Sequence, residues 1–123
     1  MSRPTPQVLD RVKNPRHCGK LEHANAVGRA DLDGQAPRYV IYLRVENNIL
    51  AECSFQVFGC GYSVASASML MELAAGQHID EARSLTAKLI EDSLGGLPVN
   101  KRFCSQMAVD AIQDAIANYQ ASS

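Results

Sequence analysis

The sequence contains no tryptophan, few aromatic residues and almost no net charge. A formal net charge of −1 gives no electrostatic reason for the chain to bind nucleic acid or an anionic membrane surface. No apolar run approaches the ~20 residues that a membrane-spanning helix needs, and the N-terminal segment lacks the apolar core of a secretory signal peptide. These absences predict a cytoplasmic protein without a nucleic-acid or membrane partner.

The four cysteines, Cys18, Cys53, Cys60 and Cys104, form no Cys-x-x-Cys pair. The sequence therefore lacks the signature of a zinc ribbon or of a thioredoxin-like site. In a cytoplasmic protein the four thiols are expected to be reduced. Cys53 falls on the apolar face of a predicted strand and is expected in the core. Any site that uses several of the other thiols has to be assembled by the fold from distant positions.

Length and apolar content are ordinary for a globular chain. With 123 residues, of which 46% are hydrophobic, the chain is expected to form one domain over residues 1–123 around a single core. Residues 1–6 are polar, contain two prolines and are expected to be disordered. No internal repeat or low-complexity tract divides the chain.

The apolar pattern predicts a helix, then a sheet, then further helices. Residues 14–38 are rich in Gly, Asn, Asp and Pro and are predicted to be loop, with one short strand near Ala26–Ala30. Strands over Tyr39–Glu46 and Ile49–Phe58 turn at Asn47-Asn48 and complete a small three-stranded antiparallel sheet with an apolar odd-numbered face. The fold class is therefore α+β, with helices packed on the sheet. Helices are expected at Pro6–Lys13, Tyr62–Ala75, His78–Leu85, Ala87–Leu94 and Arg102–Gln120.

One stretch, Phe55–Ser68, joins a predicted strand to a predicted helix through Gly59-Cys60-Gly61. Glycines on both sides let the backbone turn sharply and let a bulky ligand approach. A cysteine just before a helix is favoured as the thiolate, because the helix N-terminus attracts negative charge. We expect Cys60 to be an exposed thiol suited to metal, sulfur or nucleophilic chemistry. The alternative is a small buried cysteine in a tight turn.

A second thiol, Cys104, opens the last predicted helix in the segment KRFCSQMAVDAI. Cys60 and Cys104 each begin a helix after a loop that contains Gly or Pro, so they meet if those helix ends lie side by side. Thiolates are soft ligands that suit iron–sulfur clusters, zinc or copper(I). From spacing alone, a shared site and two separate thiols both remain open.

The chain between Asn14 and Tyr119 carries a series of motifs in a fixed order. The motifs are Asn14-Pro15-Arg16 with Gly19, Phe55-Gln56-Val57-Phe58-Gly59-Cys60-Gly61 with Ser63, Ala65, Ser66 and Ser68, Asp80-Glu81-Ala82, Gly96-Leu97-Pro98 with Lys101, Cys104-Ser105, Asp110-Ala111 and Ala117-Asn118-Tyr119. In this order they resemble the U-type iron–sulfur cluster assembly scaffolds, the IscU/NifU N-terminal-domain family. The resemblance implies a three-stranded sheet with helices on one face. It also implies a carrier rather than an enzyme, which receives sulfur from a cysteine desulfurase, builds a [2Fe–2S] cluster and passes it to acceptor proteins.

The resemblance places the family's second and third cysteines at Cys60 and Cys104, as ligands of iron or of the cluster. The family's first cysteine lies in a Cys-Gly-Asp triplet whose Asp is also a ligand. Counted from the neighbouring strand, that triplet falls on Gln35-Ala36-Pro37, so this chain lacks both ligands. Phe103 stands where a His often precedes the third cysteine. The loop that commonly reads Leu-Pro-Pro-x-Lys, a chaperone-docking motif in many members, reads Leu97-Pro98-Val99-Asn100-Lys101 here.

A [2Fe–2S] cluster takes about four protein ligands, and Cys60 and Cys104 supply only two. Cys18 is one candidate for a further metal ligand, against the alternative of a spare loop thiol. Asp31 or Asp33 is another, against the alternative of a solvated carboxylate. A homodimer in which each subunit contributes Cys60 and Cys104 also gives four thiolates. Zinc is the other metal that the family implies.

Three functions are consistent with the sequence. The first is a scaffold or carrier that binds iron or a [2Fe–2S] cluster through Cys60 and Cys104. The second is a degenerate family member that docks a desulfurase or another iron–sulfur protein without assembling clusters. The third is a sulfur-transfer protein that accepts a persulfide on Cys60 or Cys104, because a thiolate at a helix N-terminus is suited to attack persulfide sulfur.

Overall fold

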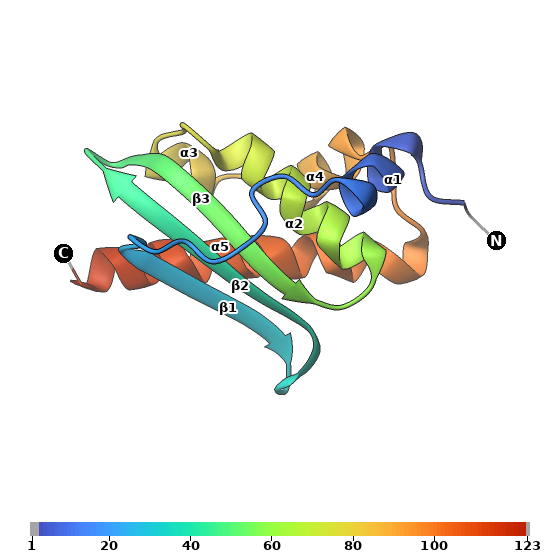
Figure 1. Cartoon of the computed structure of the whole chain (residues 1–123), viewed down its shortest axis with the longest axis horizontal. Helices are drawn as coiled ribbons and strands as arrows, with labels where there is room; N and C mark the ends of the chain where they lie inside the picture. The colour runs from blue at the N-terminus through green and yellow to red at the C-terminus, as the bar shows by residue number, and fades with distance from the viewer. Residues whose placement is uncertain (1–2, 123) are drawn as a thin grey trace.

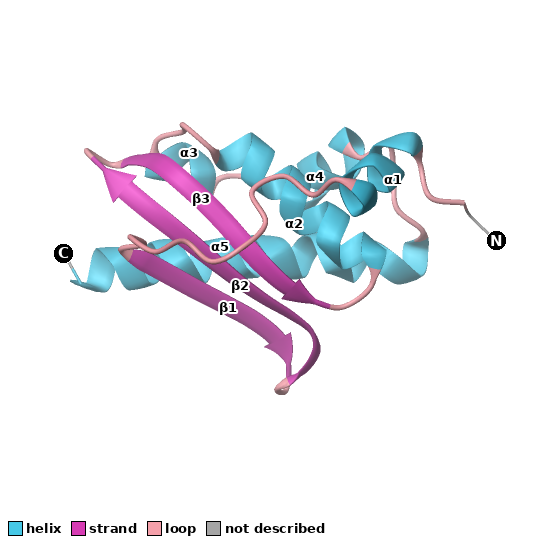
Figure 2. Cartoon of the chain, in the orientation of Figure 1, coloured by secondary structure: helices cyan, strands magenta, loops and turns pink. Residues whose placement is uncertain are grey.

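The computed structural model describes residues 3–122. The chain forms one antiparallel sheet with helices packed along one of its faces, as Figure 1 shows. Figure 2 shows the strands in front of the long C-terminal helix. The predicted α+β class and three-stranded sheet are confirmed. In chain order the elements are α1 (Pro6–Lys13), β1 (Ala26–Leu32), β2 (Gln35–Glu46), β3 (Ile49–Phe58), α2 (Gly61–Ala74), α3 (Ile79–Arg83), α4 (Ala87–Ser93), the short 3₁₀ helix η1 (Val99–Lys101) and α5 (Arg102–Ser122).

The helices agree with the sequence prediction, and their ends lie within two residues of the predicted ones. Their caps explain the agreement. His78 precedes α3 and accepts a hydrogen bond from the Asp80 backbone at 3.1 Å, and Thr86 caps α4 by accepting one from Leu89 at 3.2 Å. Such side chains satisfy N–H groups that the first turn leaves free.

The sheet has the order β1-β2-β3, with β2 in the centre and antiparallel to both neighbours. Asn47 and Asn48 have φ angles of 52° and 61° and make the turn between β2 and β3 as predicted. This conformation is one that Asn tolerates better than most residues.

The segment before β2 holds more strand than the sequence predicted. β1 continues to Leu32 and β2 begins at Gln35, four residues before the predicted start at Tyr39. Asp33 and Gly34, with φ angles of 52° and 81°, form the two-residue turn that closes this hairpin. Asp-Gly favours such turns because both residues take positive φ. The loop predicted over residues 14–38 is therefore a loop only as far as the start of β1.

Pro37 lies inside β2, although proline is rare in central strands. The pairing of β2 with β3 begins only at Arg38, which lies opposite Phe58. Pro37 therefore lies beyond the end of β3, where the strand needs no hydrogen-bond donor on that side. This placement also brings the start of β2 close to the end of β3, where the Gly59-Cys60-Gly61 turn begins.

From Tyr39 onward the odd-numbered side chains of β2 form the apolar face that the sequence predicted, and they are buried: Tyr39, Ile41, Leu43 and Val45. Leu50 on β3 breaks the odd-numbered rule and is also fully buried. The register shifts there, because Arg44 lies opposite Glu52 while Val45 lies opposite Leu50. A bulge of this kind reverses which side chains face the core. Cys53 lies on the same face and is buried, as predicted.

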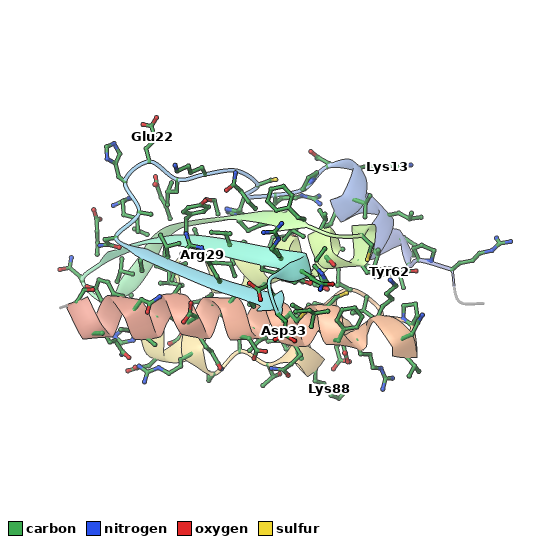
Figure 3. All side chains as sticks on the ribbon, turned by 90° about the horizontal axis from the view of Figure 1, so that it is seen from below. Lys13, Glu22, Arg29, Asp33, Tyr62 and Lys88 are labelled. Atoms are coloured by element: carbon green, nitrogen blue, oxygen red, sulfur yellow. The ribbon has the colours of Figure 1, made fainter. Side chains whose placement is uncertain are left out.

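Helix α5 lies directly against β1 at Gly28. A Cβ atom at Gly28 would lie 2.2 Å from the backbone nitrogen of Ala115 and 2.3 Å from the backbone oxygen of Ala111. Only glycine allows two backbones to approach this closely. Figure 3, turned by 90° from Figure 1, shows α5 running beneath the sheet along most of its length.

The N-terminal segment is fixed from Thr5 onward. The Thr5 hydroxyl oxygen accepts a hydrogen bond from the Val8 backbone at 3.1 Å, and its hydroxyl group donates to the Leu94 carbonyl. Pro6 is the first residue of α1. These contacts correct the prediction of disorder for Thr5 and Pro6, while residues 1 and 2 of that prediction lie outside the described residues.

The loop after α1 pairs with the outer edge of β3. The backbone of Gly19 donates to the Phe55 carbonyl at 2.8 Å, and the Phe55 backbone donates to the His17 carbonyl at 2.9 Å. Cys18 lies between these two hydrogen bonds, in a parallel bridge with Phe55. Among residues 3–122, no helix has the length and apolar character needed to cross a membrane.

Candidate functional site

Cys60 lies at the junction where β3 ends and α2 begins. It is the N-cap residue of α2, in an extended conformation, and its side chain is exposed. The backbone N–H groups of Ser63 and Val64 donate to the Cys60 carbonyl at 3.0 and 3.2 Å, which places its side chain beside the first turn of α2. The prediction of an exposed thiol at a helix start is therefore confirmed.

The surroundings of Cys60 favour its thiolate form. Partial burial raises the pKa of the thiol, but the Ser63 backbone and hydroxyl, the Tyr62 backbone and the Lys101 ammonium together lower it further, so that the pKa lies below the ordinary value. The Lys101 Nζ is 3.7 Å from the Cys60 sulfur. A lysine ammonium and a helix N-terminus are the groups expected to stabilise a thiolate.

Cys104 lies in the first turn of α5 and points into the protein interior, where it is fully buried. Burial raises the pKa of this thiol, and the neighbouring Cys60 raises it as well, while Ser63 and Tyr39 oppose the shift. The Tyr39 hydroxyl donates to the Cys104 carbonyl at 2.9 Å. Cys104 is therefore held as a neutral thiol beneath the exposed Cys60.

The Ser63 hydroxyl connects the two thiols. Its Oγ lies 3.7 Å from the Cys60 sulfur and 3.5 Å from the Cys104 sulfur. Ser63 is itself fully buried, one turn into α2 from Cys60. The structure therefore brings Cys60 and Cys104 together, which the sequence left open.

Two hollows flank the Cys60 thiol. One is lined by Ala36 and Pro37 from the start of β2, by Gly59 and Ser63, and by Lys101 and Phe103 before and within α5. Ala36 and Pro37 stand where the family resemblance expects the Gly and Asp of the missing triplet. This hollow therefore has a small apolar side chain and a proline ring where a carboxylate was expected.

The second hollow is an apolar groove between α1 and the start of α2. It is lined by Pro4, Val8, Leu9, Val12, Gly61 and Tyr62, and it shares Cys60 and Lys101 with the first. Leu9 and Val12 are 44% and 41% exposed and form an open apolar wall of this groove. The Cys60 thiol therefore lies between two hollows, and Lys101 borders both of them.

The other predicted ligands lie elsewhere. Cys18 is exposed on the loop that pairs with β3, and Asp33 lies at the tip of the β1–β2 hairpin, where Figure 3 labels it. The Asp31 carboxylate accepts a hydrogen bond from the Gly34 backbone at 2.8 Å and stabilises that turn. Within residues 3–122, no three His, Cys, Asp or Glu side chains form a cluster that could hold a metal ion.

Three further residues belong to the site although no role there was predicted for them from the sequence: Ser63, Lys101 and Tyr39. The signal for Ser63 was present, because a residue three positions after an N-cap lies on the first turn and faces the cap. Lys101 was marked only as the last residue of the family's Leu97–Lys101 motif, and Tyr39 gave no local signal, since the two reach the site from a 3₁₀ turn and from the central strand. Only the packing of α2 and α5 against β2 places them there.

Comparison with known proteins agrees with this architecture. The chain matches the model of the NifU-like N-terminal domain over residues 4–123. It is 39% identical over 113 residues to the iron–sulfur cluster assembly scaffold protein IscU 1 of Archaeoglobus fulgidus, covering 92% of this chain and 74% of that protein. The nitrogen fixation protein NifU of Azotobacter chroococcum mcd 1 is 35% identical over 116 residues, covering 93% of this chain and 38% of that protein.

Solved structures show the same fold. A NifU-like N-terminal protein from Brucella abortus superposes with a TM-score of 0.73 at 15% identity, covering 96% of this chain and 94% of that one. A putative iron–sulfur cluster assembly scaffold protein for the SUF system from Fervidobacterium islandicum AW-1 gives a TM-score of 0.72 at 18% identity, covering 91% and 95%. With the match over nearly the whole sequence, these findings show that the chain belongs to the NifU-like N-terminal domain family.

Proposed function

We propose that this protein is a scaffold that holds iron or an iron–sulfur cluster as cargo on Cys60 and Cys104 and hands it to acceptor proteins. The observation that carries the proposal is the pairing of these two thiols through Ser63, at 3.7 and 3.5 Å, beside an open hollow. Thiolates are the usual protein ligands of iron–sulfur clusters. Family membership supports this assignment, since relatives named as iron–sulfur cluster assembly scaffolds cover most of the chain.

A [2Fe–2S] cluster takes about four protein ligands, and one chain supplies two of them, the thiolates of Cys60 and Cys104. Under the proposal, the other two thiolates come from Cys60 and Cys104 of a second copy in a homodimer. Cys18 and Asp33 remain alternative donors within one chain, but each requires its loop to move toward Cys60. Cys104 is fully buried, so cargo binding also requires the first turn of α5 to open.

The partners follow from the cargo. Assembly of a cluster requires a sulfur donor, for which a cysteine desulfurase is the expected partner, and an acceptor iron–sulfur protein. Free thiols require a reducing compartment, so the proposed scaffold is expected to act in the cytoplasm. The role is that of a carrier, with no catalytic residue assigned.

The experiment is anaerobic reconstitution with ferrous iron, sulfide and a reductant, followed by measurement of bound iron and labile sulfide. Wild type and Cys53→Ala are expected to retain both, because Cys53 is a buried core residue away from the site. Cys60→Ala is expected to lose most of both. Equal iron in Cys60→Ala and wild type would sink the proposal.

A second function has a specific observation in its favour. The Lys101 ammonium at 3.7 Å and the lowered pKa of Cys60 suit a thiolate that accepts sulfur from a persulfide. Incubation with a cysteine desulfurase and cysteine, followed by mass spectrometry under non-reducing conditions, tests it. One added sulfur on Cys60 is expected, and its absence on both Cys60 and Cys104 would rule this function out.

A further inference from the structure

The two thiols of the site differ in their access to solvent. Cys60 is exposed, lines both hollows and has the Lys101 ammonium beside it at 3.7 Å. Cys104 is fully buried directly behind it, and both sulfurs lie within 4 Å of the one Ser63 oxygen, at 3.7 and 3.5 Å. An accessible thiol backed by a second, sheltered thiol is the arrangement in which a first oxidation product is resolved to a disulfide.

We propose that Cys60 and Cys104 form a redox-active pair, in which a peroxide oxidises Cys60 and Cys104 then closes an intramolecular disulfide. This modification goes beyond the scaffold function. Only its consequence for cargo binding rests on that function, because the disulfide itself requires no metal.

The chemistry balances in two steps. The Cys60 sulfur attacks one oxygen of hydrogen peroxide, the O–O bond breaks, and the products are the Cys60 sulfenic acid and one water molecule. The Cys104 sulfur then attacks the Cys60 sulfur, the S–O bond breaks, and a second water leaves with the proton of the Cys104 thiol. The two thiols together lose two electrons, and the peroxide takes them up.

The shared contact with Ser63 keeps the two sulfurs near each other before oxidation. Cys60 is the N-cap of α2 and Ser63 lies on its first turn, so a rotation of the Cys60 side chain toward the interior replaces the sulfur–hydroxyl contacts with a sulfur–sulfur bond. A disulfide requires Cβ atoms about 3.5–4.5 Å apart, so the two cysteine side chains approach each other as the bond forms. The Ser63 hydroxyl then has to turn away from between the two sulfurs.

The other two cysteines do not compete for this role. The Cys53 thiol is buried in the core and contacts the Met71 carbonyl at 3.6 Å. Cys18 is fixed on the far edge of β3 by backbone hydrogen bonds of 2.8 and 2.9 Å on either side of it. Peroxide is therefore expected to leave Cys53 untouched and to oxidise Cys18 only as an isolated surface thiol.

The disulfide would act as a switch on the site. It consumes both thiolates that one chain offers to iron, so an oxidised chain cannot hold cargo on them until a thiol reductant restores the pair. In a reducing compartment such bonds are transient and serve sensing rather than structure.

The test treats fully reduced, metal-free protein with a stoichiometric amount of hydrogen peroxide and maps the thiols by non-reducing peptide mass spectrometry. Wild type and Cys53→Ala are expected to lose two hydrogens and to yield a peptide that links Cys60 to Cys104. Cys104→Ser is expected to stop at the Cys60 sulfenic acid, which dimedone traps. Serine keeps the size of the buried side chain, and circular dichroism checks that this variant is folded.

Three results would overturn the proposal. They are a lasting sulfenic acid on Cys60 in wild type, a link from Cys60 to Cys18, and a disulfide that joins two chains. Iron loading is measured separately, before and after oxidation. If the linked chain loads as much iron as the reduced chain, the disulfide stands but these cysteines are not the cargo ligands, so the two proposals fail independently.

Discussion

At the scale of single residues, the two thiols of the site are placed in opposite electrostatic environments by their immediate neighbours. Cys60 has backbone amides and Lys101 around its sulfur, which lower its pKa, whereas burial raises the pKa of Cys104. Cys60 is therefore the reactive sulfur and Cys104 is the less reactive one, although Ser63 contacts both. Any chemistry at this site is expected to begin at Cys60.

Lys101→Met should raise the pKa of Cys60 toward its ordinary range, because it removes the ammonium that favours the thiolate. Below the ordinary thiol pKa, the variant then holds less thiolate than wild type and reacts more slowly. The measurement is the rate of Cys60 alkylation by iodoacetamide as a function of pH, resolved by peptide mass spectrometry. The expected result is a midpoint displaced to higher pH.

The matched control is Lys88→Met. Lys88 is an exposed lysine on α4 that pairs with Asp92 at 3.1 Å, and Figure 3 labels it on the side of α5 away from the sheet. Its removal should leave the Cys60 profile unchanged. An unchanged profile in Lys101→Met as well would mean that the helix start alone sets the reactivity of the thiol.

At the scale of elements, the contact between β1 and α5 fixes the distance of the long helix from the sheet. Gly28→Ala should destabilise the fold by about 1–3 kcal/mol, because the added methyl group meets helix backbone rather than a mobile side chain. Urea unfolding followed by circular dichroism measures the change. In the matched control, Gly61→Ala, the new methyl meets only the half-exposed Val12 side chain at 3.1 Å, so a much smaller change is expected. Equal stability of Gly28→Ala and wild type would mean that α5 can shift away from β1.

The elements were predictable to the extent that their signals are local. Helical spacing of apolar residues and capping residues such as Thr86 located every α-helix, and strict alternation located the centre of β2. The start of β2 was missed because Asp33-Gly34 lies in a segment full of other turn formers, where composition alone suggests a loop. The bulge opposite Val45 was missed because register depends on pairing, which the sequence of one strand does not contain.

In the site, too, the residues with local sequence signals were predictable, and the contacts that depend on packing were not. Cys60 and Cys104 were predicted from their positions at helix starts and from the family resemblance. Their contact through Ser63 and the approach of Lys101 depend on how α2 and α5 pack together. No spacing along the chain encodes that arrangement.

At the scale of the whole molecule, the presence of only two thiolates at the site of one chain predicts how many clusters each dimer carries. If the cluster bridges two chains, the reconstituted protein should elute from a sizing column as a dimer that carries about one [2Fe–2S] cluster, with about four thiolates from two chains. Iron and sulfide analysis of the dimer fraction gives the stoichiometry. Metal-free reduced protein run in parallel shows whether the cluster itself holds the dimer together.

Cys18→Ser and Asp33→Asn serve as controls, and both are expected to retain the dimer and its cluster. A cluster on a monomer that disappears in either variant would instead assign the missing ligand to that loop. The two outcomes cannot be confused, because one depends on a second copy and the other on a single side chain.

The backbone pairing of residues 17–19 with Phe55 affects the tendency of the protein to aggregate. An unpaired strand at the border of a sheet is a template on which other chains can add strands and build aggregates. By occupying the N–H and C=O groups of Phe55, this short segment blocks the outer edge of β3 near its C-terminal end. The same segment carries Cys18, so drawing that thiol toward Cys60 would uncover the border it protects. A chain that uses Cys18 as a ligand is therefore expected to self-associate more readily. A site built from Cys60 and Cys104 leaves the outer edge of β3 covered.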